Sequence, residues 1–203
     1  MNIIQNPKYY SVYKPFKVLS QFTSEEGKAS LADLYHFEDD VYPIGRLDYD
    51  SEGLLILTND NYLKYKLIEP KFHHERVYLV QVEGLPDHNS LDSIKNGVLL
   101  NIRGRNFLTD KCEISILEAE PDIPQRNPPI RFRKNIPTSW LKIILSEGKN
   151  RQVRKMTASV GLPTLRLIRF SIENLTIGNM ISGEVRQYQK DDIYKKLNIK
   201  LRR

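Results

Sequence analysis

Residues 45–60 read Gly45-Arg46-Leu47-Asp48-Tyr49-Asp50-Ser51-Glu52-Gly53-Leu54-Leu55-Ile56-Leu57-Thr58-Asn59-Asp60 and join a charged cluster to an apolar run. Four charged side chains precede Gly53, and Leu54 to Leu57 follow it without a break. A short apolar run between Gly and Asn-Asp predicts a buried strand. We therefore expect the carboxylates at the mouth of a rigid core element, where a catalytic site is better supported than on a mobile tail.

The spacing of the three carboxylates leaves their chemistry open. Asp48, Asp50 and Glu52 alternate, so an extended backbone would place them on one face, although a tight turn would break that parity. A carboxylate can act as nucleophile, general base or metal ligand. A metal-dependent nuclease and a solvated charged loop therefore both remain open, but no His or further Asp lies at a spacing that would complete a metal site.

Composition indicates a globular protein with an anionic partner. The chain has 203 residues, 40% of them hydrophobic, and a net charge of +6, which favours nucleic acid. Its single cysteine, Cys112, excludes an internal disulfide and a cysteine-based zinc site, and predicts a small buried hydrophobe. With no apolar run long enough for a membrane span and no signal-peptide pattern at its start, the chain is expected in the cytoplasm without membrane contact.

The order of expected elements predicts an α+β fold with a mostly antiparallel sheet, because strands and short helices do not alternate regularly. Strands are expected over residues 9–14, 54–57, 76–84, 139–145 and 165–172, with a meander of short strands over 98–102, 105–109 and 111–118. Helices are expected over residues 30–35, 61–68, 89–96, 151–160 and from 191 onward. Ser30, Asp60 and Asn150 are the predicted helix caps.

Residues 121–137 break this pattern with five prolines. So many prolines exclude a regular helix or a central strand, which predicts an insertion or linker. Between residues 126 and 155 nine basic residues face one acidic residue, Glu147. This bias favours a phosphate-contacting surface, and a solvated charged face is the alternative.

The expected helix 151–160 has two faces. Val153, Met156 and Val160 form one apolar stripe, as in a helix that packs on a core. Arg151, Arg154 and Lys155 flank this stripe.

Four separated segments resemble the pseudouridine synthases of the RsuA family. They are Tyr13-Lys14-Pro15; Gly45 to Asp48 with Ser51 to Leu55 and Leu57 to Asn59; Arg76-Val77-Tyr78; and Glu147 to Met156 with Val160-Gly161. Arg76 stands where the family carries lysine, which keeps the charge and changes its geometry. Residues 126–131 and 163–169 point to the E-type branch of the family, which acts on large-subunit ribosomal RNA.

The resemblance implies a cofactor-free and metal-free isomerase that converts one uridine of 23S (large-subunit) ribosomal RNA to pseudouridine. It implies that Asp48 is the nucleophile, attacking either the ribose or the base, and that the uridine is flipped out of the RNA. Tyr78 would stack on the uracil and transfer protons, and Arg154 would pair with Asp48. Arg46 would support the flipped nucleotide. A non-catalytic RNA-binding module is the remaining alternative.

The resemblance also implies one catalytic domain over residues 1–203, with two lobes around a central basic cleft and no N-terminal S4 domain. Residues 121–137 would be an insertion within it and residues 188–203 a basic tail. The expected partner is 23S ribosomal RNA or a large-subunit precursor, and the default oligomeric state is a monomer. Contacts with RNA are expected from Arg46, Lys14, Arg76, Arg126, Arg131, Arg133, Lys134, Lys149, Asn150, Arg151 and Lys155.

Overall fold

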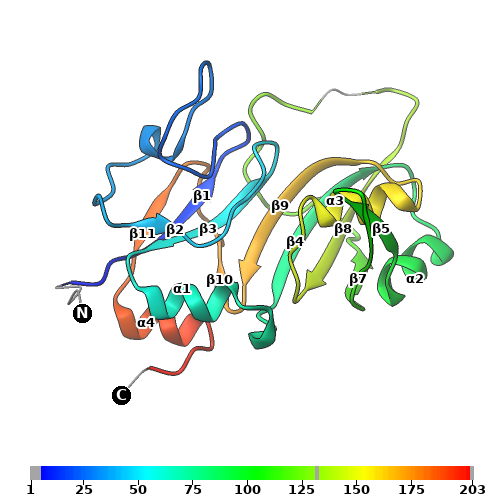
Figure 1. The fold of residues 1–203 in the computed structure, drawn as a ribbon. Coiled ribbons are helices and arrows are strands. Elements are labelled where there is room, and N and C mark those ends of the chain that lie inside the picture. The colour runs from blue at the N-terminus through cyan, green and yellow to red at the C-terminus, as the bar shows by residue number, and fades with distance from the viewer. Residues whose placement is uncertain (1–5, 131–132, 202–203) are drawn as a thin grey trace. The chain divides into compact units, whose positions relative to one another are not determined.

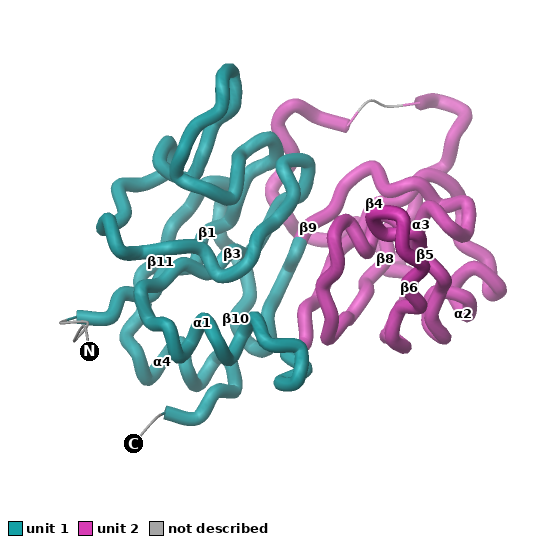
Figure 2. Tube along the Cα trace, in the orientation of Figure 1, with its two compact units in different colours: residues 1–74, 169–203 teal, residues 75–168 magenta. Residues whose placement is uncertain are grey.

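The computed structural model describes residues 6–130 and 133–201 (Figure 1). The chain forms two compact units (Figure 2): unit 1 comprises residues 1–74 and 169–203, and unit 2 comprises residues 75–168. Strand β9 (Thr164–Ile172) begins in unit 2 and ends in unit 1. The predicted α+β class is confirmed, with helices beside a mostly antiparallel sheet.

The sheet of unit 1 is organised around β1 (Tyr9–Lys14) and β3 (Glu52–Thr58). β1 pairs with β3 on one side and with β11 (Val185–Gln187) on the other. The short strands β2 (Tyr42–Pro43) and β10 (Leu175–Thr176) pair with β3 and β9 respectively. All seven residues of β3 are buried, which confirms the strand predicted from the apolar run.

Asp60 ties the helices of unit 1 to its sheet. It caps α1 (Asn61–Ile68), as predicted, accepting hydrogen bonds from two backbone amides of the first turn. The hydroxyls of Tyr9 and Tyr194 also donate to Asp60 Oδ2, at 2.8 and 2.6 Å, and so connect β1, α1 and α4 (Lys190–Lys196). The remaining elements are the 3-10 helices η1 (Leu31–Asp33) and η2 (Pro70–Phe72).

In unit 2, two helices pack against a sheet. β8 (Thr138–Leu145) lies between β4 (Arg76–Glu83) and β7 (Glu113–Ile116), and β5 (Leu99–Ile102) pairs with β6 (Arg105–Leu108) in a separate hairpin. The core lies under α2 (His88–Asn96) and α3 (Gln152–Ser159). It contains Val153 and Met156, with Val160 packed against it, which confirms the predicted apolar stripe.

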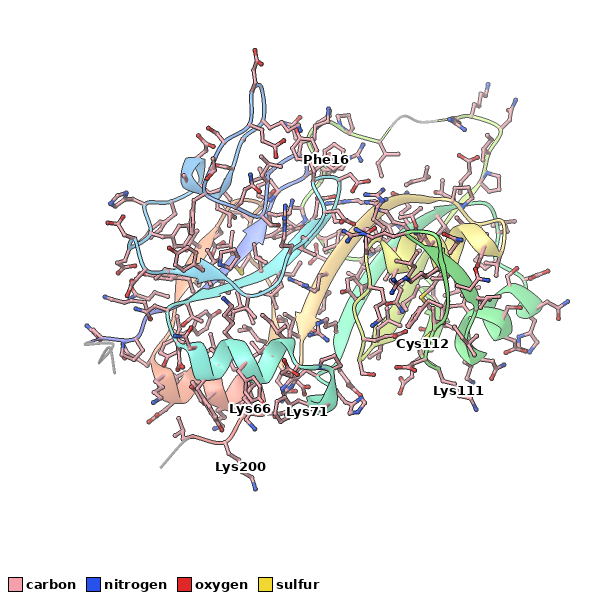
Figure 3. All side chains as sticks on the ribbon, viewed as in Figure 1. Phe16, Lys66, Lys71, Lys111, Cys112 and Lys200 are labelled. Atoms are coloured by element: carbon pink, nitrogen blue, oxygen red, sulfur yellow. The ribbon has the colours of Figure 1, made fainter. Side chains whose placement is uncertain are left out.

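Cys112 belongs to this core and is labelled in Figure 3. Its thiol lies 3.4 Å from the carbonyl oxygen of Ile94, and burial raises its pKa to about 11. Cys112 is therefore the small buried side chain that the sequence predicts, and its thiol is poorly suited to nucleophilic chemistry at neutral pH.

Three local predictions are wrong. The three short strands predicted over residues 98–118 are present, but they do not form a meander, because β7 pairs with β8 and not with β6. Asn150 does not cap α3, whose N-cap is Arg151 in the left-handed conformation with φ of +52°. The helix expected from Ser30 is only the single 3-10 turn η1, which begins with a capping box between Ser30 and Asp33.

Within the described residues, no helix is long and apolar enough to cross a membrane.

Candidate active site

The carboxylate loop comprises residues 44–51, between β2 and β3. The hydroxyl of Ser20 holds its backbone at Leu47, the residue before Asp48. Ser20 Oγ accepts a hydrogen bond from the Leu47 amide at 3.1 Å and donates to the Leu47 carbonyl oxygen at 2.8 Å. The Leu47 side chain is buried in the core of unit 1. The loop then turns, because the Ser51 amide donates to the Asp48 carbonyl oxygen at 3.0 Å. This turn interrupts the extended backbone on which a shared face of the three carboxylates depends.

Lys14, the last residue of β1, lies close enough to the carboxylates of residues 48, 50 and 52 to interact with their charges. Its side chain is fully buried, and Nζ donates to the carbonyl oxygens of Pro15 and Val18 at 2.8 Å each. Burial lowers its pKa from 10.5 to about 7, while the negative charges of Glu52, Asp50 and Asp48, in decreasing order, act to raise it. The prediction that Lys14 contacts RNA is therefore wrong, because a fully buried ammonium cannot reach a phosphate.

Gly53 brings β9 against the start of β3. Its φ is +106°, and a β-carbon placed there would lie 2.3 Å from the carbonyl oxygen of Arg169. The buried Arg169 in turn donates from Nε to the Leu54 carbonyl oxygen at 2.8 Å. Sequence reasoning gave Arg169 no role, since only its place next to Gly53 in the fold distinguishes it from other arginines. Glu52, the residue before Gly53, is also buried.

In unit 2, Tyr78 and Arg76 lie on β4. Tyr78 is 9% exposed and belongs to the hydrophobic core of the unit. Arg76 is half-buried, and its Nη1 donates to the Ser146 carbonyl oxygen at 3.4 Å. Packing in this core thus holds the tyrosine in place on its strand.

The loop before α3, residues 146–151, is held by Gln152, a buried side chain that sequence reasoning missed. Gln152 Oε1 accepts from the Lys149 amide at 2.9 Å, and Nε2 donates to Glu147 Oε1. The same Glu147 oxygen accepts from the Asp110 amide at 2.9 Å. The signal in the sequence was a glutamine in the first turn of a basic helix, where an amide can satisfy free backbone groups.

Two lysines of the predicted RNA-contact set touch the β5–β6 hairpin. Lys155 Nζ donates to the Asn101 carbonyl oxygen at 2.6 Å, and Lys149 Nζ lies 5.0 Å from the centroid of the Phe107 ring. Arg154 is half-buried on α3. Since the Lys149 side chain is exposed and its contact is a cation–π interaction, its charge stays accessible to solvent.

Among the described basic residues of the insertion, Arg133 and Lys134 are exposed and Arg126 is half-buried. Arg126 donates from Nε and Nη2 to the carbonyl oxygens of Pro128 and Pro129, at 2.9 and 3.2 Å, and so stabilises its own loop. Arg133 Nη1 lies 3.1 Å from Glu83 Oε2. Arg131 lies outside the described residues. Four further residues that are predicted to contact RNA have exposed side chains: Arg46, Lys134, Asn150 and Arg151.

The predicted catalytic residues divide between the units: Asp48 and Arg46 lie in unit 1, and Tyr78 and Arg154 lie in unit 2. Over residues 6–130 and 133–201, no group of three or more His, Cys, Asp or Glu side chains is arranged to hold a metal ion. What the geometry offers is a rigidly held loop that presents a half-buried carboxylate, Asp48.

Comparison with known proteins adds independent information. A family model described as RNA pseudouridylate synthase matches residues 8–159. The ribosomal large subunit pseudouridine synthase E of Vibrio parahaemolyticus is 46% identical over 186 residues, which cover 92% of this chain and 76% of the relative. The protein of the same name from Xanthomonas campestris is 45% identical over 181 residues, covering 88% and 92%. A crystal structure of a pseudouridylate synthase has a similar fold, with a TM-score of 0.76 at 23% identity, covering 94% of this chain and 74% of that one.

Proposed function

This chain belongs to the RNA pseudouridylate synthase family, and from that premise we propose that it isomerises one uridine of 23S ribosomal RNA. It is an RNA pseudouridine synthase. The observation that carries the choice of RNA is its 45–46% identity to relatives named as ribosomal large subunit synthases, over most of both chains.

We propose that Asp48 is the nucleophile of this reaction. The bond between N1 of uracil and C1′ of the ribose breaks, the uracil turns and a bond from C5 to C1′ forms. The proton on C5 then leaves, and N1 takes up a proton in its place. The atoms of the nucleotide are conserved, so no oxidant or co-substrate is required. Attack on the ribose and attack on the base both satisfy this balance. The rigid attachment of the loop by Ser20 supports a role in which the carboxylate must meet a particular atom.

Tyr78 and Arg154 are proposed to act on the same uridine. The aromatic ring of Tyr78 suits stacking on the uracil, and its hydroxyl suits proton transfer. A carboxylate attacks only when it is ionised, and a nearby guanidinium favours the ionised form, which is the role proposed for Arg154.

Base flipping follows from the accessibility of the substrate. A uridine stacked in RNA cannot reach a half-buried carboxylate, so the nucleotide has to be extruded at a cost of roughly a few kcal/mol. Exposed cations, Arg46 among them, are proposed to offset this cost by binding the phosphates around the flipped nucleotide.

The Asp48→Asn variant tests this proposal. Release of tritium from large-subunit RNA that carries 5-tritiated uridine measures the reaction directly, since the proton on C5 is lost. We expect the variant to lose roughly 10⁴-fold or more of the single-turnover rate, because the nucleophile is removed. Its affinity for the RNA should stay within about twofold of the wild-type value, since a neutral amide of equal size replaces a half-buried carboxylate.

Asp39→Asn is the matched control, because Asp39 is exposed in the same unit and should be dispensable. Wild-type tritium release from Asp48→Asn would overturn the mechanism. Full activity of the wild-type protein in EDTA would remove the metal-dependent alternative. Mapping of pseudouridines in ribosomal RNA from cells with and without the gene would identify the target.

A further inference from the structure

Unit 2 contains a pocket that none of the proposed catalytic residues lines. It has a volume of about 490 Å³, within the range of roughly 300–1,000 Å³ that is usual for ligand sites. Gln81 and Glu83 of β4, Thr138 of β8 and Leu165 of β9 line one side. The insertion lines the other side with residues 130 and 133–137.

Hydrogen bonds hold the described part of the insertion against the sheet. The Gly84 amide donates to the Pro137 carbonyl oxygen at 2.8 Å, and the Ile136 amide donates to the Arg133 carbonyl oxygen at 3.1 Å in a tight turn. The side chain of Arg133 contacts Glu83 across the pocket wall. The two backbone hydrogen bonds hold the pocket in shape before any ligand binds, which lowers the entropy lost on binding.

The pocket lining contains apolar side chains that can pack on the face of a nucleobase and amide side chains that can hydrogen-bond to its edge. Ile136 and Leu165 provide apolar surfaces against which a planar ring can pack. The side-chain amides of Gln81 and Asn135 each carry donors and an acceptor, which suits the hydrogen-bonding edge of an unstacked base. Gln81 lies 3.4 Å from the Thr138 hydroxyl, which orients its amide.

The charges at the pocket favour a phosphate-bearing ligand over a peptide. Arg133 and Lys134 are exposed there, within the 126–155 window of nine basic residues and one acidic residue. The ion pair of Arg133 with Glu83 is solvent-exposed, and such pairs contribute little to stability. The guanidinium can therefore exchange this carboxylate for a phosphate, to which it binds in a bidentate manner.

We propose that this pocket binds one unstacked nucleotide of the RNA substrate, other than the uridine that reacts. The base occupies the space between the insertion and the sheet, and Arg133 and Lys134 bind its flanking phosphates. The proposal rests on the proposed function, because RNA is the ligand in both, but it concerns binding and not turnover.

Binding of two short strands tests the proposal. Fluorescence anisotropy would compare a labelled oligoadenylate nonamer with an abasic ribose-phosphate strand of the same length. A base in the pocket should make the wild-type protein prefer the first strand by roughly 5- to 100-fold. Thr138→Trp fills the pocket from an exposed strand position and should reduce this ratio severalfold. Ser115→Trp is the matched control, an exposed position on β7 that does not line the pocket, and should leave the ratio unchanged.

A second variant guards against misfolding. Gln81→Leu keeps the size of the side chain and removes its amide, so it should lower the ratio without changing the circular dichroism spectrum. A wild-type ratio near one, or an unchanged ratio in both pocket variants, would overturn the proposal. Tritium release distinguishes the two hypotheses: Thr138→Trp should raise KM and keep kcat. A wild-type protein that shows the base preference but forms no pseudouridine would refute only the proposed function.

Discussion

The carboxylate loop of unit 1 and the insertion of unit 2 are both charged and irregular, yet they hold their charges in opposite ways. Next to the carboxylate loop, Lys14 and Glu52 are buried, and the loop backbone is bound by Ser20. In the insertion, Arg133 and Lys134 are exposed. Buried charges require fixed partners and so define a rigid geometry, whereas exposed cations stay available to phosphates.

This contrast predicts that substitutions around the carboxylate loop mainly affect folding, and that substitutions in the insertion mainly affect binding. Gly53→Ala should have the largest effect. Its β-carbon would overlap the Arg169 carbonyl oxygen, and its φ of +106° is strained for any other residue. We expect a loss of more than about 4 kcal/mol in the free energy of unfolding, measured by urea denaturation.

Gly45→Ala is the control within the same region. Gly45 also has a positive φ, of +70°, but no atom lies within 4 Å of the position that a β-carbon would take there. Gly45→Ala should lower the free energy of unfolding by only about 1–2 kcal/mol, which is the penalty of the left-handed conformation. Equal losses in the two variants would show that backbone strain, and not the contact with Arg169, explains Gly53.

Ser20→Ala should have the next largest effect. It removes both hydrogen bonds to Leu47 and leaves buried backbone groups without a partner, at a cost of about 1–3 kcal/mol. Tritium release should fall as well, because the position of Asp48 is loosened. Ser139→Ala, which removes one hydrogen bond to Gly84 in unit 2, should lower stability less and leave the single-turnover rate unchanged.

The lowered pKa of Lys14 should make the free energy of unfolding depend on pH. Its pKa is about 7 in the folded protein and near 10.5 when unfolded, so the unfolded state binds more protons between these values. The free energy of unfolding should therefore rise with pH over this window, by at most about 1.4 kcal/mol per pH unit. The rise should be absent from Lys14→Met and present in a variant of the exposed Lys64. Parallel curves for the wild type and Lys14→Met would contradict the assignment.

Removal of the insertion's charges should have the smallest effect on stability. Arg133→Ala with Lys134→Ala should change the free energy of unfolding by less than about 0.5 kcal/mol, because both side chains are exposed. In a plot of the logarithm of the RNA-binding constant against the logarithm of the salt concentration, the slope should become less negative by about 1.4. This is the change expected when two phosphate contacts on a single strand are lost. The pair Lys95→Ala and Lys111→Ala removes the same charge elsewhere in unit 2 and should leave the slope unchanged if the insertion is the RNA contact (Lys111 is labelled in Figure 3).

Much of the fold was predictable because its signals are local. The cap at Asp60, the apolar run of β3 and the stripe on α3 each depend on neighbours within a few residues. The α+β class and the family follow from such segments, and both predictions are confirmed. The roles of Asp48, Tyr78 and Arg154 stay predictions, which the variants above would test.

The sequence by itself determined most of the elements, the family and the candidate nucleophile, because motifs and periodicity are written in consecutive residues. Only the tertiary structure decided that Lys14 is buried, that Gly53 meets Arg169, and that the insertion forms a pocket with the sheet. The hydrogen bond from Arg169 to Leu54 joins residues 115 positions apart. No local pattern encodes such contacts, since they arise when distant strands pack together and exclude water.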